Sequence, residues 1–120
     1  MQNPDLRTTL RRAMDNARRA SSDFDLNPGY APPEGRVLKP AAVLVAVTEG
    51  GDVILTKRSA QLKHHAGQIA FAGGRRDDTD RDLVHTALRE AQEEIGLDPA
   101  SATILGDLPD HETVTNYAVT

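Results

Sequence analysis

The alternation of apolar and polar residues divides the first third of the chain into two segments of different character. Leu6, Leu10 and Met14 recur every four residues, which predicts an amphipathic helix over residues 4–20. Residues 21–39 are rich in serine, proline and glycine, and we expect them to be a linker without regular structure.

Short apolar runs in the middle of the chain predict strands. Residues 41–47 form a continuous apolar run, which is typical of a strand buried on both faces. Residues 49–52 contain two glycines and predict a turn, so residues 53–56 should return as the second strand of a hairpin. Shorter extended pieces are predicted at 68–71 and 101–108, and no final element is apparent before Thr120.

The strongest helix signal lies at residues 82–95. Four apolar residues share one stripe at helical spacing, with Ala87 beside them, and that stripe should face the core: Val84, Leu88, Ala91 and Ile95. Gly96 follows directly and is a favoured residue for ending a helix.

Composition excludes several classes of protein. A chain of 120 residues is enough for one small domain, and the 3% aromatic content requires an aliphatic core. The absence of cysteine excludes disulfides, thiolate catalysis and cysteine-bound zinc. A net charge of -4 argues against general nucleic-acid binding, though not against a small phosphorylated ligand. Without a long apolar run or an apolar leader, we expect no membrane partner and a cytoplasmic location.

Three glutamates crowd one edge of the second helix. Glu90 and Glu94 are four residues apart, and Glu93 lies between them. Such like-charge pairs cost about 0.2–0.5 kcal/mol each in an isolated helix and oppose its dipole near the C-terminus. A divalent cation would make the same cluster favourable, which indicates a Mg²⁺ or Mn²⁺ site. A solvated helix face, with Arg89 paired to Glu93, is the alternative.

The residues around these glutamates resemble a known family signature. Gly74, Asp80 and the run Arg89-Glu90-Ala91-Gln92-Glu93-Glu94-Ile95-Gly96-Leu97 resemble the Nudix box. The second half agrees at every fixed position. The first half has Asp80 where the box has Glu, and eight residues rather than seven precede Arg89.

These departures are similar to the coenzyme A pyrophosphatase branch of the family. That branch also carries an upstream motif, which is matched by Ile54-Leu55-Thr56-Lys57-Arg58-Ser59, Lys63, Gly67 and Phe71-Ala72-Gly73-Gly74. Lys63 stands where the branch usually has Arg, and Ala72 where it has Pro.

The resemblance implies a fold and an activity. The fold is of the α/β class, a Nudix-type α/β/α sandwich around a mixed sheet. Residues 1–37 would be an N-terminal helix and linker, and residues 38–120 a Nudix domain that is incomplete at its C-terminus. The activity would be metal-dependent hydrolysis of a diphosphate linkage in a nucleotide derivative, with coenzyme A or acyl-CoA expected as the substrate. A non-catalytic nucleotide-binding module, or a hydrolase of another nucleoside diphosphate derivative, is the alternative.

The resemblance also assigns roles to residues. Glu90, Glu94 and Glu93 would hold Mg²⁺ or Mn²⁺, with the choice of catalytic base among the carboxylates left open, and Arg89 would orient Glu93. Substrate phosphates would be met by the cations Lys57, Arg58 and Lys63, and a tight backbone turn would form at Gly73 and Gly74. Asp80 would either close its loop or cap the helix.

The length of the chain yields a further prediction. Since the family normally continues with more strands and a closing helix, we expect this chain to hydrolyse its substrate poorly on its own, or to be completed by a partner such as a second copy. Turnover by this chain should be compared with turnover by a version extended through those strands. Equal rates for the two would reject the expectation.

Overall fold

A computed structural model describes residues 5–17, 19–26, 29, 31–57 and 67–120. They form two units, one made of Met1–Ala41 with Thr103–Thr120 and the other of Ala42–Ala102. The chain contains both helices and strands, and its strands pair in parallel and antiparallel directions. The expected α/β class with a mixed sheet is therefore confirmed. Within the described segments, no helix has both the length and the hydropathy needed to cross a membrane.

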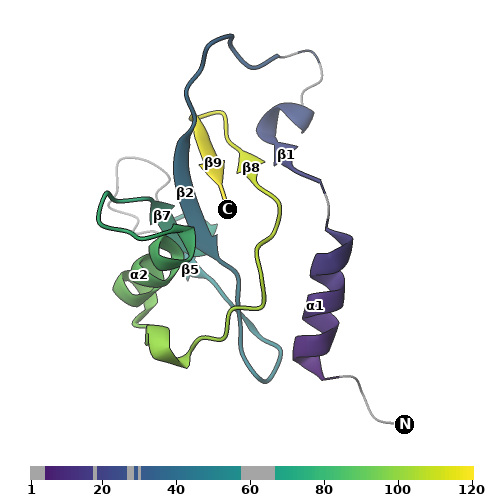
Figure 1. Ribbon diagram of the computed structural model, residues 1–120, viewed down its shortest axis with the longest axis vertical. Helices are drawn as coiled ribbons and strands as arrows, with labels where there is room; N and C mark the ends of the chain where they lie inside the picture. The colour runs from purple at the N-terminus through teal and green to yellow at the C-terminus, as the bar shows by residue number, and fades with distance from the viewer. Residues whose placement is uncertain (1–4, 18, 27–28, 30, 58–66) are drawn as a thin grey trace. The chain divides into compact units, whose positions relative to one another are not determined.

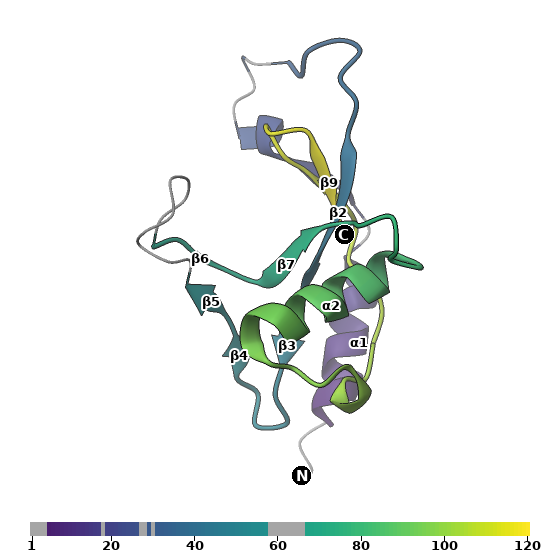
Figure 2. The same ribbon diagram turned by 90° about the vertical axis from the view of Figure 1, so that its left-hand side faces the viewer.

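The unit Ala42–Ala102 is built on a helix that packs against one strand. Helix α2 (Leu83–Ile95) lies along strand β7 (Ala72–Arg75), as Figures 1 and 2 show. Strand β7 in turn neighbours strand β2 (Lys39–Leu44). The buried side chains at these contacts are small, which lets the backbones approach closely: Ala42, Ala72, Thr86, Ala87 and Ala91.

Local signals define both ends of α2. Asp82 is the N-cap, and its side chain accepts a hydrogen bond of 2.7 Å from the backbone N–H of His85. Gly96 is left-handed at φ 69°, and its N–H bonds to the carbonyls of Ala91 and Gln92. The predicted helix at 82–95 and its glycine stop are therefore confirmed.

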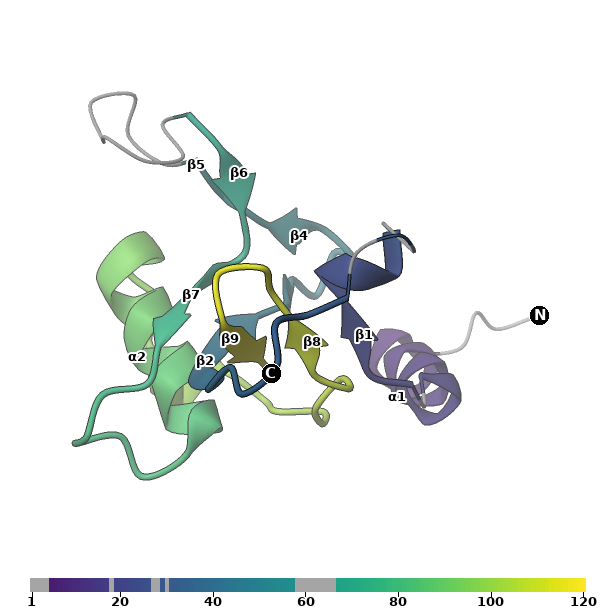
Figure 3. The ribbon, with the colours of Figure 1, turned by 90° about the horizontal axis from the view of Figure 1, so that it is seen from above.

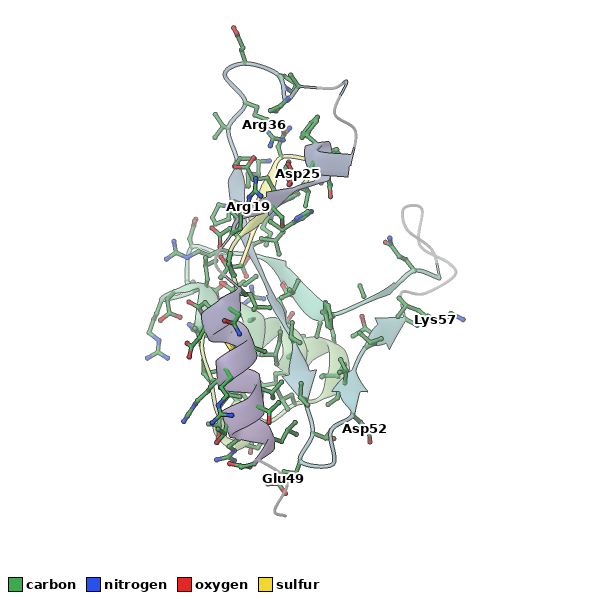
Figure 4. The ribbon with its side chains drawn as sticks, turned by 90° about the vertical axis from the view of Figure 1, so that its right-hand side faces the viewer. Arg19, Asp25, Arg36, Glu49, Asp52 and Lys57 are labelled. Carbon is green, nitrogen blue, oxygen red and sulfur yellow. The ribbon has the colours of Figure 1, made fainter. Side chains whose placement is uncertain are left out.

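Two short antiparallel ribbons complete this unit. Strand β3 (Ala46–Val47) pairs with β4 (Val53–Ile54) around the predicted turn, and β5 (Thr56–Lys57) pairs with β6 (Ile69–Ala70). Figure 4 shows Glu49 and Asp52 at the turn of the first ribbon. The predicted hairpin and the extended piece at 68–71 are thus confirmed.

One predicted strand is wrong in two respects. The apolar run at 41–47 is interrupted at Val45, and only Ala41 and Ala42 within it are buried. After β2 the run leaves the larger sheet and continues as β3 in a two-stranded ribbon. A ribbon of two strands is too small to be buried on both faces. Val45 is therefore 42% exposed.

The other unit is a small mixed sheet with one helix. It contains α1 (Leu6–Asn16), β1 (Ser21–Ser22), the 3-10 turn η1 (Asp23–Leu26), β8 (His111–Glu112), β9 (Tyr117–Val119) and residues 39–41 of β2. Strand β1 runs parallel to β8, β8 antiparallel to β9, and β9 parallel to β2 (Figure 3).

Four expectations for the sequence of this unit are corrected. Residues 21–26 carry β1 and η1 rather than irregular linker, and β9 lies in the final residues, where no element is expected. The strand predicted at 101–108 is wrong, because Ser101 ends the 3-10 turn η2 (Pro99–Ser101) and residues 102–108 form no strand. Gly106 there has φ 150°, and a side chain on it would come within 2.7 Å of Met14 Cε, so this segment lies against α1 instead of pairing with a strand. Helix α1 is also shorter than the predicted 4–20.

Two polar clusters join the ends of this unit. Arg36 donates to Glu112 Oε2 at 2.8 Å and to the carbonyl of Thr113 at 3.0 Å, and its guanidinium lies 5.0 Å from the centre of the Phe24 ring. Asp23 Oδ1 lies 2.7 Å from His111 Nε2, and Oδ2 accepts from the N–H of Val114.

The Asp23 contacts give stability a pH dependence. The hydrogen bond with His111 and then that from Val114 lower the pKa of Asp23. A carboxyl whose folded pKa is depressed stabilises the fold above its unfolded pKa, and loses that contribution as the pH falls through the folded pKa. We expect Asp23→Asn to lower the free energy of unfolding at pH 7 by at most about 1 kcal/mol, because the pair is partly exposed to water.

Urea unfolding at pH 7 and near pH 3 checks this expectation, with Asp107→Asn as a control on an exposed carboxylate of the same unit. The deficit of Asp23→Asn should shrink at the lower pH. A deficit that is equal at both values would contradict the assignment.

Candidate catalytic site

A buried carboxylate lies at the centre of the loop that joins β7 to α2. Asp80 is only 2% exposed. Its Oδ1 accepts from Arg89 Nε at 2.9 Å, and its Oδ2 accepts from Arg89 Nη2 at 3.0 Å, the N–H of Asp77 at 2.9 Å and Thr86 Oγ1 at 2.9 Å. Asp80 therefore closes the loop, and the cap of the helix is Asp82. This decides between the two roles left open for Asp80.

Arg89 connects this loop to the glutamates of α2. Beyond its two-pronged contact with Asp80, its Nη1 lies 3.2 Å from Glu90 Oε1 and 3.3 Å from Glu93 Oε1. The hydrogen bonds between Arg89 and Asp80 hold the pKa of Asp80 well below its usual range and raise that of Arg89, against the opposing effect of burial. The pair is consequently charged throughout the physiological range.

Glu90 is less exposed than Glu93, the other glutamate paired with Arg89. Its side chain is 18% exposed, against 59% for Glu93. Burial raises the pKa of Glu90 above its ordinary value, Arg89 opposes that rise, and the charges of Glu93 and Glu94 add to it. Burial and the two neighbouring glutamates thus outweigh the stabilisation of the ionised Glu90 carboxylate by Arg89.

The backbone of β7 forms one wall beside Glu90. A methyl group on Gly74 would come within 2.5 Å of Glu90 Oε1, and a methyl group on Gly73 would collide with the carbonyl of Ala42 and the backbone of Val43. Both glycines lie within strand β7 and not in a tight turn, so the predicted turn is wrong. Their role is close approach, Gly73 to β2 and Gly74 to the carboxylate.

The donor set fits a hard divalent cation. Glu90, Glu93 and Glu94 supply only carboxylate oxygens, and the latter two are exposed, with Glu93 also paired to Arg89. Among the described residues, no three acidic or histidine side chains converge as a preformed cage. Mg²⁺ and Mn²⁺ do not require one, because Mg²⁺ in particular keeps several waters and binds through one or two carboxylates together with phosphate oxygens.

The predicted substrate contacts are only partly placed. Lys57 lies at the end of β5 with its side chain extended away from the ribbon (Figure 4), and in the described part of the chain it forms no ion pair with α2. Arg58 and Lys63 lie outside the described residues. The structure therefore brings together Gly74 of β7 with Arg89, Glu90 and Glu93 of α2. Gly73 faces β2 instead, and Glu94 is an exposed residue of the same helix.

Sequence reasoning missed two members of this cluster. Asp77 Oδ2 lies 3.4 Å from Arg89 Nη2. Thr86 is fully buried and bonds Asp80. The signal for Thr86 was available, since it is a hydroxyl residue next to Ala87 on the buried side of α2.

Comparison with known proteins assigns the chain to a family. The NUDIX domain matches residues 38–119, and the chain belongs to this family. Its relatives include proteins named uncharacterized Nudix hydrolase NudL from Cronobacter sakazakii, Pectobacterium atrosepticum and Escherichia fergusonii, which are 50%, 49% and 46% identical over 82 residues. The matched segment is 67% of this chain and 43% of each of these relatives, so the chain spans less than half of their length.

The two glycines of β7 should respond differently to substitution. Gly74→Ala meets the movable end of a side chain, so we expect it to push the Glu90 carboxylate aside and weaken Mn²⁺ binding with little loss of stability. Gly73→Ala meets backbone atoms and should lower the free energy of unfolding by about 1–3 kcal/mol.

Mn²⁺ titration and urea unfolding of both variants measure these effects. Gly50→Ala serves as the control, because the nearest atom to its added methyl group is 3.8 Å away. Equal loss of stability in Gly73→Ala and Gly74→Ala would refute the separate roles.

Proposed function

We propose that the chain carries the catalytic domain of a metal-dependent hydrolase that cleaves a diphosphate linkage in a nucleotide derivative. The observation that supports this most strongly is the environment of Glu90. Its carboxylate lies close to Gly74, and burial together with the charges of Glu93 and Glu94 raises its pKa. If this face of α2 only contacted solvent, there would be no reason to bury the Glu90 carboxylate beside Glu93 and Glu94.

Charge balance supports a cation at this edge. The guanidinium of Arg89 contacts the carboxylates of Asp77, Asp80, Glu90 and Glu93, and its shortest bonds go to Asp80. One positive charge therefore cannot neutralise the cluster. Mg²⁺ or Mn²⁺ held by Glu90, Glu93 and Glu94 would compensate for the excess. When bound, such an ion neutralises the diphosphate and lowers the pKa of a coordinated water.

The environment of the glutamates favours a division of work. Glu90 is mostly shielded from water, and burial raises its pKa, which suits a carboxylate that accepts a proton. Arg89 holds Glu90 and Glu93 while it is itself held by Asp80. Glu94 is exposed, which leaves its side chain accessible to a ligand.

Coenzyme A or acyl-CoA is the substrate class that we favour. Three features of the sequence support it: Asp80 in place of the usual glutamate, the loop that is one residue longer, and the upstream segment that begins at Ile54. Lys57, Arg58 and Lys63 are the cations assigned to its phosphates. A binding module that keeps the fold without turnover is the second candidate, and the retention of Arg89 with all three glutamates argues for the enzyme.

Product analysis tests the substrate class. The chain, and a version extended at its C-terminus, should be incubated with coenzyme A, nucleoside triphosphates and dinucleoside polyphosphates, in Mg²⁺, in Mn²⁺ and in chelator. We expect coenzyme A to yield an adenosine bisphosphate product and a phosphorylated pantetheine product only when metal is present. Turnover of another compound instead would move the assignment to that substrate, and metal-dependent binding without turnover would favour the binding module.

Removal of one carboxylate tests the metal assignment. Glu94→Gln should lower kcat by roughly 100-fold or more, because it removes a charged metal ligand. The free energy of unfolding should change by no more than about 0.5 kcal/mol, since the residue is exposed.

Glu49→Gln, at the exposed turn between β3 and β4, is the matched control and should keep full activity. Full activity of Glu94→Gln would show that the metal is bound elsewhere.

A further inference from the structure

We propose that Thr86 is a positioning residue for the candidate site: its hydroxyl fixes the Asp80 carboxylate, and through it the guanidinium of Arg89 that faces Glu90 and Glu93. The inference rests on the proposed function insofar as those glutamates bind the metal. Thr86 itself lies in the spacer between Asp80 and Arg89, and its hydroxyl bonds Asp80 and the carbonyl of Asp82 rather than Glu90 or Glu93.

The contacts of Thr86 are those of a donor with a charged acceptor. Thr86 Oγ1 lies 2.9 Å from Asp80 Oδ2 and 3.2 Å from the carbonyl oxygen of Asp82. A hydroxyl has one proton to donate, and the nearer carboxylate is the stronger acceptor. Because Thr86 is fully buried, water cannot replace this bond if the hydroxyl is removed.

The carboxylate of Asp80 has its two oxygens in different settings. Oδ2 receives Thr86, the N–H of Asp77 and Arg89 Nη2, whereas Oδ1 receives Arg89 Nε alone. The hydrogen bonds from Thr86 and Asp77 come from groups that are fixed in the helix and the loop. They therefore orient the Asp80 carboxylate independently of Arg89. Arg89 then has one geometry in which Nε and Nη2 both reach it.

Because the guanidinium of Arg89 is planar, the orientation of the Asp80 carboxylate also determines how Arg89 faces Glu90 and Glu93. Once Nε and Nη2 are fixed on Asp80, the position of the third nitrogen, Nη1, is fixed as well. In the structure Nη1 lies 3.2 Å from Glu90 Oε1 and 3.3 Å from Glu93 Oε1. The orientation therefore passes from Thr86 to Asp80, then to Arg89 and finally to the two glutamates.

A purely structural role for Thr86 makes a different expectation. If the hydroxyl served only to satisfy the first turn of α2 and to fill space beside Ala87, its loss would lower stability, yet every folded molecule would bind metal as the native chain does. The two roles are separated by measurements on the folded fraction of each variant.

Thr86→Ser and Thr86→Ala form the informative pair, because both remove the methyl group and they differ only in the hydroxyl. Thr86→Val adds an isosteric variant without a hydroxyl. Thr48→Val is the control, since Thr48 Oγ1 accepts a hydrogen bond from the N–H of Asp52 at the turn between β3 and β4 of the same unit. The readouts are the NMR signal of the Arg89 Nε proton, the affinity for Mn²⁺ alone by electron paramagnetic resonance, and kcat and KM on the substrate that the native chain hydrolyses.

We expect Thr86→Ala and Thr86→Val to lose or broaden the Nε signal, and to weaken Mn²⁺ binding and lower kcat by roughly 10-fold each, with KM changed less. Thr86→Ser should restore all of these, and Thr48→Val should alter none. Native Mn²⁺ affinity and kcat in folded Thr86→Ala would overturn the role of Thr86 even if Thr86→Val does not fold. A native chain that binds no Mn²⁺ would overturn the proposed function, and this inference with it.

Discussion

The burial of one carboxylate governs the arrangement of the candidate site. Asp80 is removed from water and stays ionised because Arg89, Thr86 and the backbone of Asp77 all donate to it. A buried charge without such partners is strongly unfavourable, so the loop and the helix must hold these groups together. The shortest bonds of Arg89 go to Asp80, and its remaining nitrogen is shared between Glu90 and Glu93. The cation that we propose at the glutamates would follow from the same constraint.

Small residues between α2 and β7 allow the Glu90 carboxylate to lie close to the strand. Ala72, Ala87 and Ala91 are buried between β7 and α2, and Gly74 leaves no side chain in front of Glu90. A larger residue at any of these places would move the helix or the carboxylate. The alanine-rich core is consistent with the low aromatic content, and it serves the site by close approach as much as by burial of apolar area.

The sequence was most informative where the signal is local. The helix at 82–95, its stop at Gly96 and the turn between β3 and β4 depend on neighbouring residues, and all three are found as expected. Of the predicted apolar stripe, Ala91 is buried, whereas Val84, Leu88 and Ile95 are half-buried. Strands β1, β8 and β9 are only two or three residues long, so no periodic pattern marks them. The pairings of β1 with β8 and of β9 with β2 also join segments that are far apart in the sequence. The role of Thr86 depends on a carboxylate six residues away, across a loop whose path the composition does not specify. Motif resemblance located Arg89 and the glutamates, whereas the contacts of Asp80 required the structure.

The most direct measurement is paramagnetic NMR of the isotopically labelled chain during titration with Mn²⁺. The ion broadens signals steeply with proximity, so it reports where the cation lies without requiring turnover. We expect the amide signals of Gly74, Glu90, Glu93 and Glu94 to broaden first, and competition with Mg²⁺ to restore them. Broadening centred instead on other acidic residues, such as Asp107 and Asp110, or no localised broadening at all, would contradict the account.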